Sequence, residues 1–318
     1  MPHVDLKGVY NITPTPFTPG GELDLESLRR LTRFMIDLQV DGLTILGVLG
    51  EADKLTDAER DSVIATVVEA ASGRVPICVG TTHAGTDGCI AFSRQAQRLG
   101  AQAIMVAPPK LARSSDAALF RHYLAVAEAV DIPIVIQDHP ASSGVFMSVE
   151  FLATIGERAA HCRYVKLEDE PTPPKITEIL KASPGTVVLG GLGGIMFVEE
   201  LARGAAGTMT GFGFPEILVD IYRRHRAGDH DGACAVFDRF ASLIRFENQP
   251  RINLPLRKHV YKLRGAISSD RARMPAFPVD EGTVRDLHAL LARLNLMEKV
   301  RLKPDTTTDA VATGFNST

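Results

Sequence analysis

The sequence is short of the patterns that mark secreted, membrane and zinc-binding proteins. It has four cysteines, and none of them forms a Cys-x-x-Cys pair or a Cys/His cluster with zinc spacing. No apolar run approaches the ~20 residues of a membrane span. The segment Met1–Leu6 lacks the basic stretch and apolar stretch of a signal peptide. We therefore expect a cytoplasmic protein with reduced thiols, no metal and no membrane partner.

An excess of positive charge is also missing. The chain carries 35 Lys and Arg against 38 Asp and Glu, so its formal net charge is −3. Proteins that bind nucleic acid or anionic membranes usually carry a basic excess, so we expect neither as a partner. The 318 residues are 45% hydrophobic, which is enough for a large core. An α/β barrel can occupy more than 200 residues as one unit, so length alone does not require two domains.

Short apolar runs recur along the first two thirds of the chain. Most are rich in β-branched residues and lack apolar/polar alternation, which is typical of strands buried on both faces of a parallel sheet. The eight runs are Gly8–Ile12, Leu43–Gly47, Val75–Gly80, Ala103–Ala107, Ile132–Ile136, Tyr164–Leu167, Thr186–Gly190 and Gly207–Thr210.

The segments between these runs have the apolar spacing of helices. Thr56 followed by Glu59 is a capping box, which marks a helix start. Eight strand–helix units predict a (β/α)8 barrel of the α/β class, whereas a doubly wound sheet lacks support because no GxGxxG follows the first strand. The predicted helices are Leu25–Leu38, Thr56–Ala71, Thr86–Leu99, Ser115–Val130, Ser148–Gly156, Pro174–Ala182, Ile195–Arg203 and Phe214–His225.

Three further helical segments follow without strands between them, at His230–Phe246, Asn253–Arg264 and Glu281–Leu294. The last residues, Lys299–Thr318, are polar, rich in Thr and without periodicity. We therefore predict a barrel over residues 1–228, a helical extension over 229–298 and a disordered tail over 299–318.

One lysine stands out at the strand ends, where barrel enzymes carry their chemistry. Lys166 lies inside the apolar sixth run, and a buried lysine is rare unless it is paired. Removing an ammonium group from water favours the neutral amine, which attacks carbonyl carbons. The alternative is a structural salt bridge to Glu168 or Asp169.

Three loops that follow other runs have unusual composition. The segment Gly47–Glu51 contains two glycines, which would let backbone N–H groups approach an anion, although an ordinary tight loop would look the same. Polar residues crowd Gln137–Pro140 after the fifth run. Four glycines in Gly190–Gly194 indicate close backbone approach to a ligand or a helix, and a phosphate site is weakly supported because the P-loop Lys-Ser/Thr is absent.

Taken in order, these motifs resemble the dihydrodipicolinate synthase / N-acetylneuraminate lyase family of class I aldolases. The resemblance rests on Gly8–Tyr10 with Thr13–Phe17, on Gly47–Glu51, on Pro133–Pro140, on Lys166 and on Gly207–Gly211. It implies a (β/α)8 barrel with a helical C-terminal extension, assembled as a homotetramer or homodimer and needing no cofactor.

The resemblance also implies roles for individual residues. Lys166 would attack the ketone of pyruvate or a related 2-oxo acid. The loop of Gly47, Val48, Leu49, Gly50 and Glu51 would hold the substrate carboxylate through its backbone N–H groups. In the last motif, Thr210 and Gly211 are further candidates for substrate binding.

The chain departs from the family pattern at several of these positions. Val48 and Leu49 replace the usual Thr or Ser, and Gln137 replaces a Tyr that relays protons, a task an amide cannot perform. Ser142 replaces the Arg with which true synthases bind the aldehyde substrate, and Pro108–Lys110 replaces a tyrosine pair.

We keep Gln137 as a catalytic-site candidate and expect His139 to carry the proton. Residues two apart on a strand share a face, so His139 would point like Gln137 if the strand continues. Imidazole exchanges protons near neutral pH. The alternative is that His139 turns outward before Pro140 and only hydrogen-bonds a loop. A bound water or a substrate carboxylate would then carry the proton.

These residues favour a lyase, either an aldolase or a dehydratase, acting on pyruvate or a 2-oxo acid that could derive from a sugar. A synthase condensing pyruvate with aspartate semialdehyde is the first alternative, and the missing Tyr and Arg speak against it. A non-catalytic 2-oxo-acid-binding regulatory barrel is the second, and retention of Lys166 with Gly47–Glu51 speaks against it. A metal-dependent aldolase is disfavoured because His83, His122, His139 and His161 show no paired ligand spacing.

Overall fold

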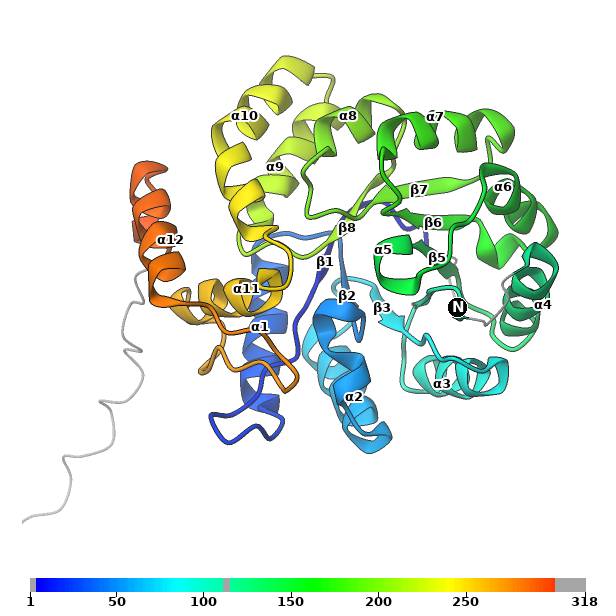
Figure 1. Ribbon diagram of the computed structural model, residues 1–318, viewed down its shortest axis with the longest axis horizontal. Coiled ribbons are helices and arrows are strands. Elements are labelled where there is room, and N and C mark those ends of the chain that lie inside the picture. The colour runs from blue at the N-terminus through cyan, green and yellow to red at the C-terminus, as the bar shows by residue number, and fades with distance from the viewer. Residues whose placement is uncertain (1–3, 111–114, 301–318) are drawn as a thin grey trace, which may run out of the picture.

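A computed structural model describes residues 4–110 and 115–300 of the chain (Figure 1). Eight parallel strands form a closed barrel in sequence order, with the first strand paired to the last. This confirms the (β/α)8 prediction, and each strand end falls within two residues of its predicted place. The strands are β1 (Gly8–Ile12), β2 (Gly42–Ile45), β3 (Ile77–Gly80), β4 (Ala103–Val106), β5 (Ile134–Asp138), β6 (Tyr164–Leu167), β7 (Val187–Gly190) and β8 (Gly207–Thr210).

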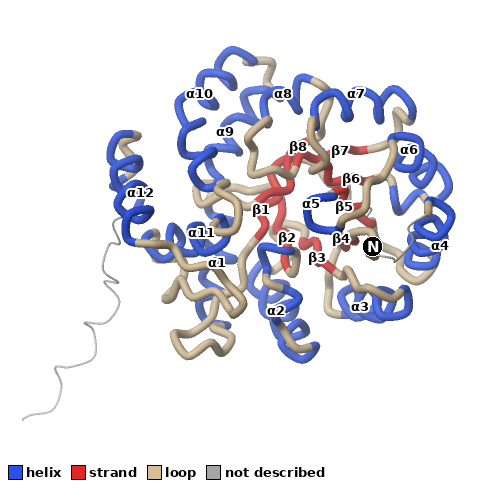
Figure 2. The backbone as a smooth tube through the Cα atoms, viewed as in Figure 1, coloured by secondary structure: helices blue, strands red, loops and turns tan. Residues whose placement is uncertain are grey.

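The helices form a ring outside the barrel, as Figure 2 shows by the red strands inside the blue helices. The predicted capping box is present at α2, where Thr56 accepts from the Glu59 N–H and Glu59 accepts from the Thr56 N–H at 2.9 Å. The ring consists of α1 (Leu25–Asp37), α2 (Asp57–Ala71), α3 (Thr86–Arg98), α4 (Asp116–Ala127), α6 (Val149–Arg158), α7 (Thr172–Ala182), α8 (Phe197–Ala202) and α9 (Pro215–Arg226).

Two apolar cores explain why the strand sequences are almost wholly apolar. One set of side chains fills the barrel, and the other packs between the sheet and the helices. Because alternate residues of each strand enter one core or the other, both faces of every strand are buried. The barrel core consists of Leu6, Tyr10, Ile12, Cys78, Ala103, Met105, Val135, Tyr164, Leu189 and Met209.

The C-terminal part is helical, with α10 (His230–Glu247), α11 (Asn253–Leu263), α12 (Glu281–Arg293) and α13 (Met297–Val300). Helix α11 is attached to the loop that follows β8, because the Tyr261 hydroxyl donates to the Phe212 carbonyl at 2.8 Å. The sequence places the start of a disordered tail at Lys299, but α13 continues through Val300, and residues 301–318 lie outside the described part. None of the described helices is long and apolar enough to cross a membrane.

Helix α5 (Pro140–Ser143) is a short element that the sequence did not predict. It begins directly after β5 and lies in front of the strand ends in Figure 2. Pro140 occupies its first turn, where the missing N–H costs nothing, and Gly144 ends it with a positive φ of 71°. This turn places His139 and Ser142 at the mouth of the barrel.

Candidate active site

Lys166 points into the barrel from β6. Its neighbour two residues earlier, Tyr164, belongs to the barrel core, so strand alternation directs Lys166 to the same interior. The side chain is only 2% exposed, and its Nζ lies 2.9 Å from Oε2 of Glu168. The lysine is thus both buried and paired, which joins the two interpretations that the sequence left open.

Glu168 gathers the polar side chains of the site around one carboxylate. Its Oε2 accepts a hydrogen bond of 2.8 Å from Nε2 of Gln137, in addition to its contact with Lys166. The register of β5 and β6 pairs Gln137 with Lys166, which brings the two side chains to one level. Glu168 itself is 8% exposed. The sequence identified this residue only as a salt-bridge partner, although its position two residues after Lys166 predicts the same face.

Gly191 leaves space for the side chains of Lys166 and Glu168. A Cβ atom at this position would lie 2.8 Å from Cδ of Glu168 and 2.9 Å from Cε of Lys166. Such distances are shorter than real Cβ contacts, so any side chain here would displace the pair. The glycine-rich segment after β7 therefore provides close approach to two side chains of the site.

Thr210 supports that segment from the neighbouring strand. Its Oγ1 donates to the Gly191 carbonyl at 2.9 Å and accepts from the Gly193 N–H at 2.7 Å. Both capacities of the hydroxyl are used within the protein, so Thr210 shapes the loop. Gly211 follows it at the barrel mouth.

His139 stands one residue beyond the end of β5 and precedes α5. Its Nδ1 lies 2.8 Å from Oγ of Ser142 and 3.9 Å from Oε2 of Glu168. The side chain is 22% exposed, so it faces the mouth while remaining in contact with solvent. The structure thus brings His139 to the edge of the Lys166–Glu168–Gln137 cluster.

Asp138 points the other way, as strand alternation predicts. Its Oδ2 lies 2.6 Å from Nζ of Lys175 on α7, outside the barrel. Burial raises the pKa of Asp138 to about 6, against the opposing effect of the Lys175 ammonium. This residue orients a helix of the outer ring.

The loop Gly47–Glu51 lies after β2 and contains a single 3₁₀ turn, η1 (Val48–Gly50). The N–H groups of Val48 and Leu49 are at the first turn, where helix geometry offers them no acceptor. The Gly50 carbonyl accepts a hydrogen bond of 2.6 Å from Thr15, which fixes the loop to the segment after β1. The backbone of this loop is therefore held in place with donors unused by the helix.

The Glu51 carboxylate is committed to the protein. It is fully buried and forms an ion pair with Lys258 of α11. Its other oxygen accepts from Lys54 Nζ at 3.0 Å and from the Arg273 N–H at 2.9 Å. Glu51 thus ties the loop after β2 to the C-terminal helical part.

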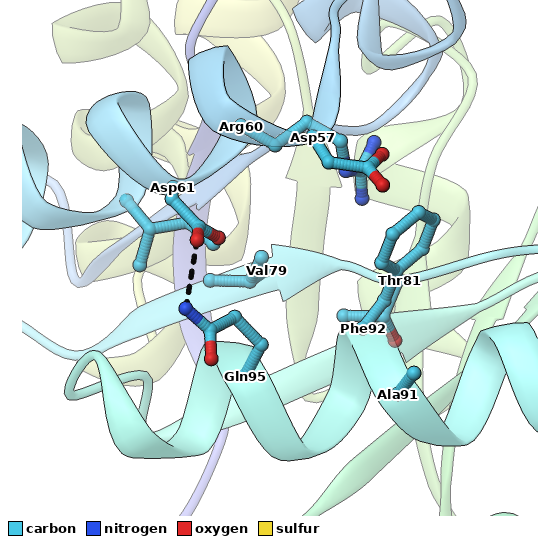
Figure 3. A pocket seen from close by; sticks show the side chains of 9 residues that line it. Asp57, Arg60, Asp61, Val79, Thr81, Ala91, Phe92 and Gln95 are labelled. Carbon is cyan, nitrogen blue, oxygen red and sulfur yellow. Dashed lines mark hydrogen bonds between the residues drawn. The ribbon is translucent and has the colours of Figure 1, made fainter.

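A cavity of about 210 Å³ lies between α2 and α3, as Figure 3 shows. Val79 on its floor belongs to the core outside the barrel, so the cavity is separate from the Lys166 cluster. Two of its charged groups have partners: Arg60 donates to the Gly80 carbonyl at 2.9 Å, and Asp61 accepts from Gln95 at 2.7 Å. We therefore place the chemistry at the strand ends.

Comparison with known proteins identifies the family of the chain. The model of the dihydrodipicolinate synthetase family matches residues 5–294. The chain belongs to this family. Among curated relatives, L-2-keto-3-deoxyarabonate dehydratase of Azospirillum brasilense is 37% identical over 91% of this chain and 94% of its own. The 4-hydroxy-tetrahydrodipicolinate synthase of Xanthomonas axonopodis pv. citri is 34% identical over 76% of this chain and 80% of its own.

Solved structures of the dihydrodipicolinate synthetase family show the same fold. The synthase from Rhodopseudomonas palustris has a TM-score of 0.86 and 34% identity, with 91% of this chain and 97% of that chain covered. YagE, an Escherichia coli K12 prophage protein solved in complex with pyruvate, has a TM-score of 0.86 and 25% identity, with 92% and 100% covered. The protein is a lyase-type enzyme of the class I aldolase type, and its substrate is a small molecule.

The departures from the family pattern now have positions in space. Gln137, in place of the relay Tyr, donates to Glu168 in the center of the site. Ser142, in place of an Arg, bonds to His139 at the mouth. Val48, in place of a hydroxyl residue, is 58% exposed, and Leu49 packs toward the barrel core. In this family member the side chains of Gln137 and Lys166 both contact Glu168.

Proposed function

We propose that the protein dehydrates a 2-keto-3-deoxy sugar acid through a Schiff base on Lys166. The observation that carries the proposal is the buried contact of 2.9 Å between Lys166 Nζ and Glu168 Oε2. It pairs a nucleophile with a proton acceptor where the relay Tyr of the family is missing. The 37% identical dehydratase from Azospirillum brasilense supports the substrate class.

Schiff-base formation begins when Lys166 transfers a proton to Glu168. The neutral amine attacks the C2 carbonyl carbon of the substrate. The carbonyl oxygen takes one proton from the amine and one back from Glu168 and leaves as water, so Glu168 is again a carboxylate. The resulting iminium draws electrons from C2 and weakens the C–H bond at C3. The contact with Glu168 thus activates the nucleophile before the substrate is bound covalently.

The elimination step uses the same carboxylate as its base. Glu168 removes a proton from C3, and the electron pair forms an enamine. The enamine electrons then form the C3–C4 double bond and expel the C4 hydroxyl, which takes the proton from Glu168 and leaves as water. Hydrolysis of the iminium by water releases the unsaturated 2-oxo acid and regenerates the Lys166 amine. A general acid–base group of this kind typically contributes ~10²–10⁴ in rate.

Gln137 and His139 complete the proposed proton path. Gln137 holds Glu168 in place through a neutral hydrogen bond of 2.8 Å, which orients the carboxylate without neutralising it. His139 lies 3.9 Å from the same oxygen and is 22% exposed, so we assign it the exchange of protons between Glu168 and solvent. The substrate carboxylate binds at the N–H groups of Val48 and Leu49, between the glycines Gly47 and Gly50, with Gly211 opposite.

The fit to a neutral sugar chain favours this function over the synthase reaction. Ser142 at the mouth offers a hydroxyl and no charge, which suits a hydroxylated substrate better than the carboxylate of aspartate semialdehyde. We further propose that the enzyme is cytoplasmic and assembles as a homotetramer or homodimer. If a Schiff base forms without turnover, the protein is instead a non-catalytic 2-oxo-acid-binding barrel.

Borohydride trapping tests the proposal. Borohydride reduces an iminium irreversibly, so incubation with pyruvate or a 2-keto-3-deoxypentonate should leave one adduct, located on Lys166 by peptide mass. The pentonate should also lose one water per turnover in the wild type and none in Lys166→Met. An adduct on another lysine, with Lys166 unmodified, would overturn the assignment.

A further inference from the structure

Helix α11, in the C-terminal part of the chain, places a buried arginine at the barrel mouth. Arg257 is 3% exposed, yet the hydrogen bonds among described residues engage only one of its two terminal nitrogens. That nitrogen, Nη2, donates to Oδ1 of Asn248 at 2.6 Å. Nε lacks a hydrogen-bond partner, although Oε2 of Glu247 lies 3.7 Å from it. A buried guanidinium with an unused donor edge is costly unless an anion completes it.

Nη1, the terminal nitrogen without a hydrogen bond to a described residue, lies beside Gly211. A Cβ atom on Gly211 would be 3.4 Å from Nη1 of Arg257 and 2.6 Å from Cδ1 of Leu49. Leu49 in turn packs against the barrel core. The guanidinium therefore reaches the inner side of the barrel, next to the loop whose N–H groups are unused by the helix.

Strand register places this point above the lysine. Lys166 pairs with Leu189, and Gly190 pairs with Thr208, so Gly191 is level with Met209. Gly211 is two residues further along, which is one inward-facing position closer to the mouth. Since the Lys166 side chain extends to the level of Gly191, Arg257 lies in the next layer above the reacting nitrogen.

We propose that Arg257 binds the carboxylate of the 2-oxo acid substrate, together with the backbone N–H groups of Val48 and Leu49. This inference rests on the proposed function, because it assigns the anion to the substrate of the Lys166 site. Hydroxyl groups are missing at Val48 and Leu49, and a guanidinium edge is a stronger partner for a carboxylate than a hydroxyl. The C-terminal helices thereby contribute a residue that touches the substrate.

The chemistry around Arg257 is consistent with this role. Burial raises the pKa of Glu247 to about 7, so its carboxyl is only partly ionised at neutral pH. The Oε2 atom of Glu247 that lies 3.7 Å from Arg257 Nε also accepts the Gly213 N–H at 2.8 Å, so this oxygen is shared. Part of the arginine charge is thus available to a bound anion.

Arg264 provides a matched control at the end of the same helix. Its side chain is 4% exposed at the loop after β8, and its Nε lacks a partner like that of Arg257, but both of its terminal nitrogens have partners. Nη1 donates to the Gly213 carbonyl at 2.6 Å, and Nη2 lies 2.8 Å from Glu216. A change at Arg264 perturbs the same helix contact without altering the donors that face the mouth.

The test compares pyruvate with pyruvamide, which carries the same ketone but no negative charge. The concentration that gives half-maximal borohydride-trapped adduct is measured for both ligands by intact mass. In the wild type, pyruvate should be trapped at a much lower concentration than pyruvamide. In Arg257→Gln, half-saturation by pyruvate should rise about 10- to 100-fold, as expected for the loss of one hydrogen bond to a charged group. The value for pyruvamide should change less than threefold, roughly the scatter expected for such single contacts.

The controls separate recognition from stability. Arg264→Gln should leave the pyruvate to pyruvamide ratio at its wild-type value, and Arg257→Lys, which keeps the charge, should lie between wild type and Arg257→Gln. If Arg257→Gln does not fold, as judged by circular dichroism and thermal unfolding, Arg257→Lys and the two ligands on the wild type carry the test. Equal effects on both ligands, or none, would overturn the role of Arg257.

Failure of the proposed function would look different. It would appear as no adduct from any 2-oxo acid with the wild type, or as an adduct without loss of water from the pentonate. In the second case the comparison of pyruvate with pyruvamide still applies. In the first case, calorimetric binding of pyruvate to Lys166→Met, with and without Arg257→Gln, still measures the carboxylate contact. A tenfold or greater loss of affinity on adding Arg257→Gln supports the inference, and an unchanged affinity overturns it.

Discussion

Gln137 on β5 and Glu168 beyond β6 are joined by a hydrogen bond of 2.8 Å, and the oxygen that accepts it is the one that contacts Lys166. Two strands therefore hold one carboxylate at the lysine. A phenol at the Gln137 position would bring a proton of its own to this point, whereas an amide brings only orientation. In the proposed mechanism the proton chemistry therefore depends on Glu168.

Glu168→Gln should lower turnover of a 2-keto-3-deoxypentonate by ~10²–10⁴, the usual contribution of a general acid–base group. The variant keeps the shape of the side chain and removes its charge and its proton. Steady-state kinetics measures the loss, and borohydride trapping shows whether the adduct still forms. Gln137→Met, which removes only the orienting hydrogen bond, should cost less. Turnover of Glu168→Gln close to wild type would contradict the assignment.

His139→Phe should lower turnover by about tenfold or more, within the lower range of acid–base effects, while the Schiff base still forms. The ring of Phe fills the same place at the mouth but exchanges no protons. Ser142→Ala is the control, because it removes the partner of His139 Nδ1 and leaves the imidazole in place. If His139→Phe turns over at the wild-type rate, His139 is structural and water carries the proton.

Gly191→Ala should abolish both the adduct and turnover. The new methyl group would lie 2.9 Å from Cε of Lys166, so the lysine or the loop has to move. Overpacking of this kind typically costs ~1–3 kcal/mol, which urea unfolding can resolve. Gly185→Ala is the control, since nothing lies within 4 Å of its added Cβ. A Gly191→Ala enzyme that forms the adduct normally would show that the site tolerates displacement.

Glu200→Gln should remove a pH dependence of stability. Glu200 is buried and accepts from Thr172 at 2.7 Å, and burial raises its pKa to about 7 from 4.5. A raised pKa in the folded state contributes stability that is present below about pH 4.5 and is lost as the pH rises through about 7. The loss is about 3 kcal/mol at most, since one pKa unit corresponds to about 1.4 kcal/mol.

The measurement for Glu200 is urea unfolding of wild type and Glu200→Gln at pH 5 and pH 8. The free energy of unfolding of the wild type should fall more between these two values than that of the variant. Thr172→Val, which removes the hydrogen-bond donor, should leave the loss in place. Equal pH dependence in wild type and Glu200→Gln would show that this carboxyl does not titrate in the range.

The protein should have little dihydrodipicolinate synthase activity. Loss of a charged partner for a buried carboxylate typically costs ~2–5 kcal/mol, and Ser142 stands where true synthases carry an Arg. The assay uses pyruvate with aspartate semialdehyde and an authentic synthase measured alongside. Comparable turnover in the two enzymes would show that the acceptor is bound in another way.

The sequence by itself determined the barrel and its lysine. Eight apolar runs such as Tyr164–Leu167 predict buried parallel strands, because a strand buried on both faces has no polar alternation. The capping box at Thr56 and Glu59 is equally local, since both partners lie within one turn. Lys166 could be found in the same way, because a lysine within an apolar strand needs a reason to be there.

Only the tertiary structure decided how the site is assembled. Gln137 and Glu168 belong to different strands, and their contact depends on the register that barrel closure sets. Gly191 is required by the size of two side chains from another strand, and Arg257 reaches the mouth because α11 folds back onto the loop after β8. Periodicity and spacing are properties of neighbours along the chain, whereas these contacts join residues that only the packing of the barrel and its C-terminal helices brings together.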